Sequence, residues 1–182
     1  MAAMAEKLWQ VAGPAVLEQL KENVGYDFVI TGHSLGAGTA ALLNIMCHEN
    51  DRSLVGGRRV ECFTFAASPV FEPLEAAPQA VQATTNYVHG YDVVPFLSVD
   101  SVRHTLACFA SIAEKCETLD WRSRLRLAVG YTEPDQDLMD HIVEASQRRL
   151  PPKEGAPVLF IPAANNVWVR PVSEGVYAIG WF

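Results

Sequence analysis

The sequence has few of the features that hold a metal ion or bind nucleic acid. Four cysteines stand among 182 residues, and none forms a C-x-x-C pair or a Cys/His spacing typical of a zinc site. The formal net charge is -7, and the lysines and arginines are scattered. Binding to a phosphate backbone requires a concentrated basic surface. We therefore expect no nucleic-acid partner, no metal and no cofactor.

The nearest approach to a basic cluster is the segment WRSRLR, in which Arg122, Arg124 and Arg126 alternate with serine and leucine after a tryptophan. This alternation is typical of a solvated helix face. Contact with an anionic surface is the less favoured interpretation.

Long apolar runs are also missing. No segment approaches the roughly 20 apolar residues that span a bilayer. The N-terminal segment MAAMAEKLWQVAGPAVLEQL has no basic start followed by an apolar run, as a secretory signal has. We therefore expect a cytoplasmic or peripheral membrane protein.

Short apolar runs alternate with helical patterns through the first half of the chain. The β-forming runs, each too short for a buried helix, predict strands at Tyr26–Ile30, Val60–Ala66 and Thr85–His89. Helical patterns precede the first run, follow it and separate the second from the third, at 8–22, 40–47 and 75–83. This alternation predicts an α/β fold with a mostly parallel sheet and helices on both faces.

The second half of the chain changes character. Residues 100–149 are predicted to be helical with a break near 130–134, and APVLFIP, VWVRPV and GVYAIGWF predict two or three closing strands. We therefore expect a single domain over residues 1–182 with a helical insertion at about 100–149.

Gly32-His33-Ser34-Leu35-Gly36 matches G-x-S-x-G and stands directly between a predicted strand and a predicted helix. A turn that pushes the serine hydroxyl out of the sheet is strained and leaves no room for a Cβ two residues to either side. Gly32 and Gly36 meet that requirement. Ser34 is therefore the candidate nucleophile, and the backbone N–H of Leu35 is the candidate donor to an oxyanion.

The sequence of this turn has two other interpretations. A phosphate-binding loop requires Lys followed by Ser or Thr after the glycines, whereas Thr39 and Ala40 stand here. A glycine-rich turn without chemistry is the remaining alternative.

Three segments together, GHSLGAGTAALL, FTFAASPVF and HGYDVVPFLS, resemble the class 3 lipases and particularly their diacylglycerol lipase-like branch. The similarity is clearest over residues 26–99. The resemblance implies an α/β-hydrolase fold, an esterase acting on acylglycerols such as diacylglycerol or triacylglycerol, a Ser–Asp–His triad and no metal. It also implies that this domain is incomplete at its N-terminal side, where a second oxyanion donor arises, and at its C-terminus.

Asp92 is the candidate triad acid, because it follows a predicted strand and its D-x-V-P context resembles the position of the acid in the family. The base should follow the acid in the chain. His104 and His141 do so, but each lies in a helical pattern typical of a structural or solvated histidine. The resemblance instead places the base beyond Phe182, with His141 as the alternative. We expect His33 to pack beneath the turn.

The leading hypothesis is a serine-dependent lipase with a lipid ester as its substrate and contact with a lipid interface. The alternative is a non-catalytic hydrolase-like domain that binds lipid or protein. A thioesterase or peptidase on the same fold is less favoured, because neither the Pro95 loop nor the apolar residues after Ser34 suggest those substrates.

Overall fold

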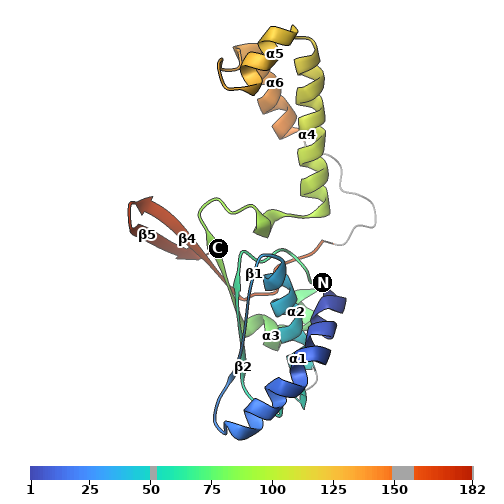
Figure 1. The fold of residues 1–182 in the computed structure, drawn as a ribbon, viewed down its shortest axis with the longest axis vertical. Coiled ribbons are helices and arrows are strands. Elements are labelled where there is room, and N and C mark those ends of the chain that lie inside the picture. Colours follow the sequence, from blue (N-terminus) through green and yellow to red (C-terminus); the bar gives the residue numbers. More distant parts are fainter. Residues whose placement is uncertain (50–52, 149–157, 182) are drawn as a thin grey trace. The chain divides into compact units, whose positions relative to one another are not determined.

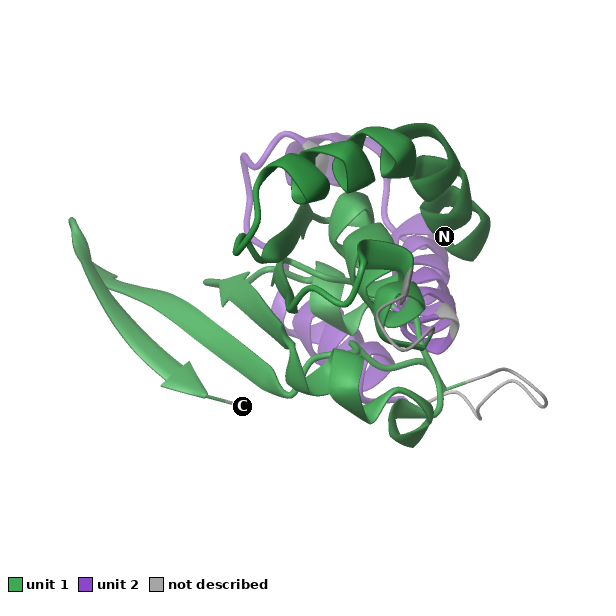
Figure 2. Ribbon diagram, turned by 90° about the horizontal axis from the view of Figure 1, so that it is seen from below, with its two compact units in different colours: residues 1–97, 157–182 green, residues 98–156 purple. Residues whose placement is uncertain are grey.

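The computed structural model describes residues 1–49, 53–148 and 158–181. The chain divides into two compact units, one formed by residues 1–97 with 157–182 and the other by residues 98–156 (Figure 2). The expected single domain with a helical insertion stays a prediction, and each unit is described by itself.

The first unit contains one five-stranded sheet in the order β1-β2-β3-β4-β5 (Figure 1). Its strands are β1 (Phe28–His33), β2 (Val60–Phe65), β3 (Thr84–His89), β4 (Asn165–Ser173) and β5 (Val176–Trp181). Strands β1 to β4 are parallel, and β5 is antiparallel to β4. The predicted mostly parallel α/β architecture and its first three strands are thus confirmed. Of APVLFIP, residues 156 and 157 lie outside the described residues, and Phe160 makes only an isolated bridge to Phe71.

Helices of the first unit cover one face of this sheet. They are α1 (Ala2–Glu22), α2 (Leu35–Glu49) and α3 (Pro78–Gln82). Alternate residues of β2 and β3, such as Cys62, are buried beneath them, and Ile30 is the buried residue of β1. The core beneath α1 and α2 consists of Ala5, Leu20, Ile30, Ala40, Leu43, Cys47, Val55, Val60 and Cys62. Helices on both faces were expected. Among the described residues of this unit, the helices pack on one.

The opposite face carries a row of side chains that follows the strand register. His33, Phe65, Tyr87, Val167 and Trp181 are neighbours across all five strands. The Phe65 and Tyr87 rings stack with centroids 5.2 Å apart. Trp181 is 73% exposed at the outer strand. Four of the five side chains in this row are therefore apolar or aromatic, and the fifth is the imidazole of His33.

Short 3-10 helices occur at η1 (Ser53–Val55), η2 (Leu74–Ala76) and η3 (Val94–Phe96). The helix expected at 75–83 is divided into η2 and α3. Pro78 begins α3, and a proline disfavours helical backbone at the residue before it. Ala77 accordingly has φ -136° and ψ 56°, which interrupts the helix.

The second unit consists of α4 (Val99–Glu117), α5 (Trp121–Ala128) and α6 (Gln136–Gln147). Side-chain caps explain where each helix begins: Ser98 and Ser101 form a capping box on α4, and Asp120 and Asp135 cap α5 and α6. Contacts between α4 and α6 hold the unit together. No helix in the described ranges is both long and apolar enough to cross a membrane.

Candidate active site

Two of the predicted site residues lie at the carboxyl edge of the parallel sheet. Ser34 directly follows β1, and Asp92 follows β3 after a short turn. Strand β2 lies between β1 and β3. Two strand spacings of about 4.8 Å separate the ends of β1 and β3 by about 10 Å.

Ser34 occupies a strained backbone conformation at the junction of β1 and α2, with φ 54°. A non-glycine residue in this region costs of order 1–3 kcal/mol, and the surrounding structure must hold it there. The N–H of Ser34 donates to the carbonyl of Phe65 at 2.9 Å, and its own carbonyl accepts from Ala37 N at 2.9 Å and Gly38 N at 3.2 Å. Both sides of the turn are thus fixed, one by the sheet and one by the helix.

The two glycines of the motif are not equivalent. A Cβ at Gly32 would lie 2.5 Å from the carbonyl carbon of Gly36 and 2.8 Å from Ala37 N. A Cβ at Gly36 would meet no heavy atom within 4 Å among the described residues. The expectation that both positions exclude a Cβ is therefore wrong for Gly36. The first turn of α2 passes over Gly32, so steric exclusion falls on the strand side alone.

Leu35 is the first residue of α2, and its side chain is 54% exposed. The first N–H groups of a helix have no intrahelical acceptor. Within the described residues, no acceptor is present for the N–H of Leu35. The partial positive charge of the helix N-terminus is concentrated at the same place. This N–H is thus available to an anionic oxygen bound beside Ser34.

Buried hydrogen bonds fix the chain after β2, next to the Ser34 turn. Asn86 is fully buried, and its Oδ1 accepts from Thr64 Oγ1 at 3.0 Å and from Ala67 N at 3.2 Å. Its Nδ2 donates to Asn166 Oδ1 at 3.1 Å. Ala66, between these anchors, has φ 55°. Of the described residues, the non-glycine ones with positive φ are Ser34 and Ala66, and both lie at this edge.

Asp92 lies in a tight turn and is half-buried. Its N–H donates to the His89 carbonyl at 3.1 Å, and its Oδ1 accepts from Val94 N at 2.9 Å. Within the described residues, Oδ2 has no hydrogen-bond partner. The carboxylate therefore both stabilises the turn before Pro95 and keeps one oxygen available.

An apolar cavity of about 590 Å³ lies beside Asp92. Its lining consists of Val88, Gly90, Tyr91, Asp92, Val93, Phe96 and Trp168. The indole N–H of Trp168 donates to the Gly90 carbonyl at 2.8 Å and so fixes the turn that carries Asp92. Sequence analysis did not single out Trp168. Trp168 lies beside the cavity because β4 pairs with β3 so that Trp168 is the register partner of Val88. This pairing cannot be read from the sequence alone.

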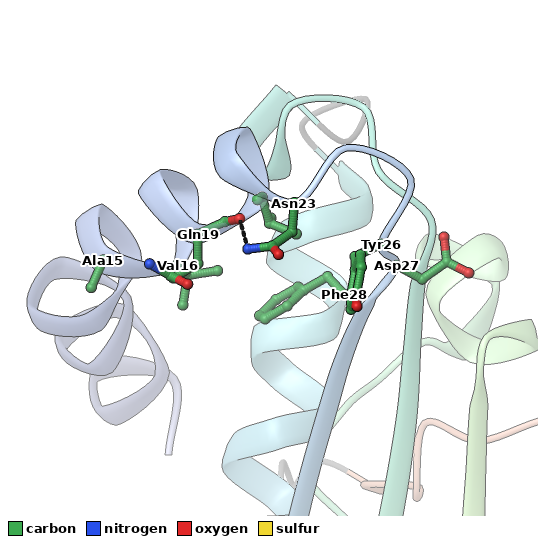
Figure 3. Close-up of a pocket in the computed structure, with 8 residues that line it drawn as sticks. Ala15, Val16, Gln19, Asn23, Tyr26, Asp27 and Phe28 are labelled. Carbon is green, nitrogen blue, oxygen red and sulfur yellow. Dashed lines mark hydrogen bonds between the residues drawn. The ribbon is translucent and has the colours of Figure 1, made fainter.

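A second cavity, of about 460 Å³, lies between the end of α1 and the start of β1 (Figure 3). Val16, Asn23 and Phe28 are among its lining residues, and Asn23 Nδ2 donates to the Gln19 carbonyl at 2.8 Å. Because Phe28 begins β1 and Ser34 follows its end, this cavity lies at the opposite edge of the sheet from the candidate nucleophile.

The three histidines considered from the sequence occupy two different settings. His33 is exposed and alternates onto the helix-free face, so the expectation that it packs beneath the turn is wrong. His104 and His141 lie in the second unit. His104 Nε2 is 3.0 Å from the Ser146 carbonyl. His141 Nε2 is 3.1 Å from both the carbonyl and the hydroxyl of Ser111. Both rings thus connect α4 and α6.

No group of three or more His, Cys, Asp or Glu side chains that could hold a metal ion occurs in the part of the chain that the structure describes.

The family described as lipase (class 3) matches residues 1–102 of the 182. The chain belongs to the class 3 lipase family. A comparison with curated protein sequences gives no match.

Solved lipase structures are similar to part of the chain. A lipase from Rhizopus microsporus var. chinensis is 20% identical, with 55% of this chain and 35% of that chain covered and a TM-score of 0.48. Lipase II from Rhizopus niveus is 25% identical, with 54% and 38% covered and a TM-score of 0.47. The Rhizomucor miehei triacylglyceride lipase is 21% identical, with 53% and 37% covered and a TM-score of 0.45. The chain spans little more than a third of the length of these lipases.

Proposed function

We propose that this chain supplies the nucleophile, Ser34, and the triad acid, Asp92, of a serine-dependent hydrolase of carboxylic esters, acting on acylglycerols such as diacylglycerol or triacylglycerol. The observation that carries the proposal is the strained φ of 54° at Ser34, at a strand-to-helix junction that follows a parallel strand. Such strain persists only where the surrounding structure enforces it, and it concentrates at functional sites.

In the proposed reaction, Ser34 Oγ attacks the ester carbonyl carbon while a histidine accepts the hydroxyl proton. The tetrahedral intermediate places its oxyanion near the N–H of Leu35, and it collapses as the alcohol leaves with the proton from the histidine. Water then hydrolyses the acyl-enzyme by the same sequence of steps. Asp92 orients the histidine and stabilises its protonated form.

The spacing of the two residues supports this assignment. An imidazole that hydrogen-bonds a serine at one nitrogen and a carboxylate at the other spans about 8 Å, with each hydrogen bond about 2.6–3.2 Å long. The ends of β1 and β3, which precede Ser34 and Asp92, lie about 10 Å apart across β2, a separation of the same order as this bridge. Oδ2 of Asp92 is the oxygen that the imidazole would contact.

We propose that the base is a histidine beyond Phe182, with His141 as the alternative. The contacts of His141 and His104 support the first choice, because Nε2 of each ring meets a backbone carbonyl between α4 and α6, as in a structural histidine. The apolar cavity beside Asp92 supports a lipid ester as the substrate, since its lining is mostly apolar. We also propose a cytoplasmic or peripheral membrane location for the chain.

Chemical rescue with imidazole tests the site in the chain as it stands. A fluorophosphonate should label Ser34 slowly, because loss of a triad member lowers rates by roughly 10⁴ to 10⁶. Added imidazole should accelerate labelling, since it can occupy the place of the base beside Asp92. Intact-mass analysis follows the adduct, and Ser34→Ala should remove it.

Further variants separate the alternatives. Asp92→Asn should abolish the acceleration by imidazole, whereas His141→Ala should leave it unchanged. Fast labelling without imidazole that His141→Ala abolishes would identify His141 as the base. No adduct at Ser34 under any condition would refute the proposal in favour of a non-catalytic domain that binds lipid or protein.

A further inference from the structure

Helix α5 of the second unit directs its largest apolar side chains toward solvent. Trp121 is 67% exposed and Leu125 is 55% exposed. At about 100° per residue these two positions share one side of the helix. Ser123 and Leu127, on the opposite side, are half-buried and face the rest of the unit. The three arginines of this helix are exposed, as expected for a solvated helix face, but the two apolar side chains are exposed beside them.

Arginines flank the outward apolar stripe. The helix carries three arginines and no acidic residue. By the same helical spacing, Arg122 and Arg126 lie on one flank of the stripe and Arg124 on the other. The Arg122 guanidinium lies 5.4 Å from the centroid of the Trp121 ring. A helix with an apolar stripe, a tryptophan and basic flanks is the pattern of a segment that lies in a membrane interface.

One arginine fixes the helix and leaves the other two for a partner. Arg124 donates from Nε to the Leu119 carbonyl at 2.9 Å and from Nη2 to the Glu117 carbonyl at 2.8 Å. These bonds tie α5 to the end of α4. Among the described residues, Arg122 and Arg126 make no such bonds to backbone carbonyls, and their charges face solvent, although Arg126 also interacts electrostatically with Asp120.

Local hydrogen bonds cap both ends of α5. The apolar stripe therefore lies on a helix with fixed ends. Asp120 Oδ1 accepts from Arg122 N at 2.9 Å and Ser123 N at 3.2 Å. At the other end, Gly130 has φ 71°, and Tyr131 N donates to the Arg126 carbonyl at 2.8 Å. Tyr131 is 84% exposed and adds a second aromatic ring beyond the helix.

We propose that α5 is a docking element for anionic lipid surfaces. Trp121 and Leu125 enter the boundary between headgroups and acyl chains, while Arg122 and Arg126 contact the lipid phosphates. The tryptophan together with the basic flanks favours an anionic membrane as the partner, and a second copy of the chain is an alternative outcome of the test. The proposal goes beyond the proposed function and does not depend on it, because none of these residues belongs to the Ser34 site.

Vesicle binding by the full 182-residue chain tests the contribution of the arginine charges to lipid binding. The chain should bind vesicles of phosphatidylcholine with phosphatidylserine more tightly than vesicles of phosphatidylcholine alone. The double variant Arg122→Gln, Arg126→Gln should lower the partition coefficient on the anionic vesicles about 30-fold, since each arginine near the surface contributes about 1 kcal/mol. The control, Lys7→Gln with Lys21→Gln on α1, makes the same change in net charge at exposed positions and should change binding less than twofold.

Two single variants test the apolar stripe. Leu125→Ser should lower vesicle binding about tenfold, because a buried leucine side chain contributes about 1.5–3 kcal/mol and is only partly inserted here. Val11→Ser on α1, at a position that is 74% exposed, is the matched control and should bind as the unchanged chain does. Trp121→Phe should retain most of the binding but lose the blue shift of tryptophan fluorescence that vesicles cause.

Three outcomes would overturn the proposal. One is equal binding by the arginine double variant and its lysine control. Another is a blue shift that survives Trp121→Phe. The third is self-association, measured by sedimentation velocity without lipid, that Leu125→Ser abolishes, because it would assign the stripe to a second copy of the chain. Circular dichroism of each variant confirms that a loss of binding is not a loss of helix.

Discussion

The carbonyl carbon of Gly36 lies within 2.5 Å of the place where a Cβ of residue 32 would begin. The helix α2 thus crosses the end of β1 with no space for a side chain on the strand side. On its own side, Gly36 faces open space among the described residues. A Cβ is therefore excluded by steric clash at Gly32 but not at Gly36. Substituting each glycine by alanine tests this difference.

Gly32→Ala should destabilise the chain by at least about 2 kcal/mol, because the new Cβ meets backbone atoms that cannot move independently. Gly36→Ala should be neutral or stabilise by up to about 1 kcal/mol, because alanine favours the helix more than glycine does. Urea unfolding of the two variants gives the comparison. Equal destabilisation by both would contradict the asymmetry seen at the turn.

Asn86→Ala should cost about 2–4 kcal/mol of unfolding free energy. The substitution leaves the buried Ala67 N–H without its acceptor and leaves the Thr64 hydroxyl only the Thr85 carbonyl at 3.5 Å, and an unsatisfied group of this kind costs about 1–3 kcal/mol. Asn166→Ala is the control, because Asn166 is half-buried and meets the Nδ2 of Asn86 rather than its acceptor oxygen. It should cost clearly less in the same urea titration.

The cysteine thiols should differ sharply in reactivity. Burial raises the pKa of Cys47 to about 11. It likewise raises the pKa of Cys62 to about 12, against the opposing hydrogen bond from Thr84. At pH 8 iodoacetamide should therefore modify the half-buried Cys108 and Cys116 and leave the other two unmodified until urea unfolds the chain. Peptide mass spectrometry identifies the sites, and early modification of Cys62 would show that β2 opens easily.

The same raised pKa values predict a loss of stability at alkaline pH. Below about pH 8.5 the two thiols are protonated in both the folded and the unfolded chain. As the pH rises further, the unfolded chain releases these protons first, so the free energy of unfolding falls until about pH 11 to 12. Replacing Cys62 by alanine should reduce the slope of stability against pH in this window. An unchanged slope would assign the alkaline loss to other groups.

His141→Ala should weaken the packing of α4 on α6. The ring nitrogen meets the carbonyl and the hydroxyl of Ser111, and loss of a hydrogen bond of this kind costs about 0.5–1.5 kcal/mol. Amide hydrogen exchange in α6 should become faster, while exchange in β1 to β3 stays the same. Unchanged exchange in α6 would mean that the His141 contact does not hold the two helices together.

The sequence was sufficient for those parts of the fold that depend on local pattern. Apolar runs of strand length predicted β1, β2 and β3 to within two residues at most boundaries. The break near 130–134 separates α5 from α6 as expected, whereas the break before Asp120 was missed, because its cap is a single side chain in a helical pattern. Pairing between distant strands leaves no such local signal.

Site features that depend on the register of distant strands could not be predicted from the sequence. The turn of Ser34 was predictable because the motif itself enforces it. The space around Gly36 depends on where α2 crosses β1, and the contact of Trp168 with Gly90 depends on the pairing of β3 with β4. The position of His33 follows from the alternation of side chains along β1, which is a local pattern.

The pairing of β3 with β4 has a consequence for folding kinetics. Tyr87 is the register partner of Val167, so a parallel ladder must close across the whole second unit. An unstructured loop of this length costs about 2 kcal/mol more to close than one of ten residues. A helical unit that forms early from local contacts shortens that search, because it replaces most of the loop with a folded body. Early formation of α4 to α6 thereby raises the rate at which β4 and β5 pair with the rest of the sheet. This effect is independent of any role of these helices in binding.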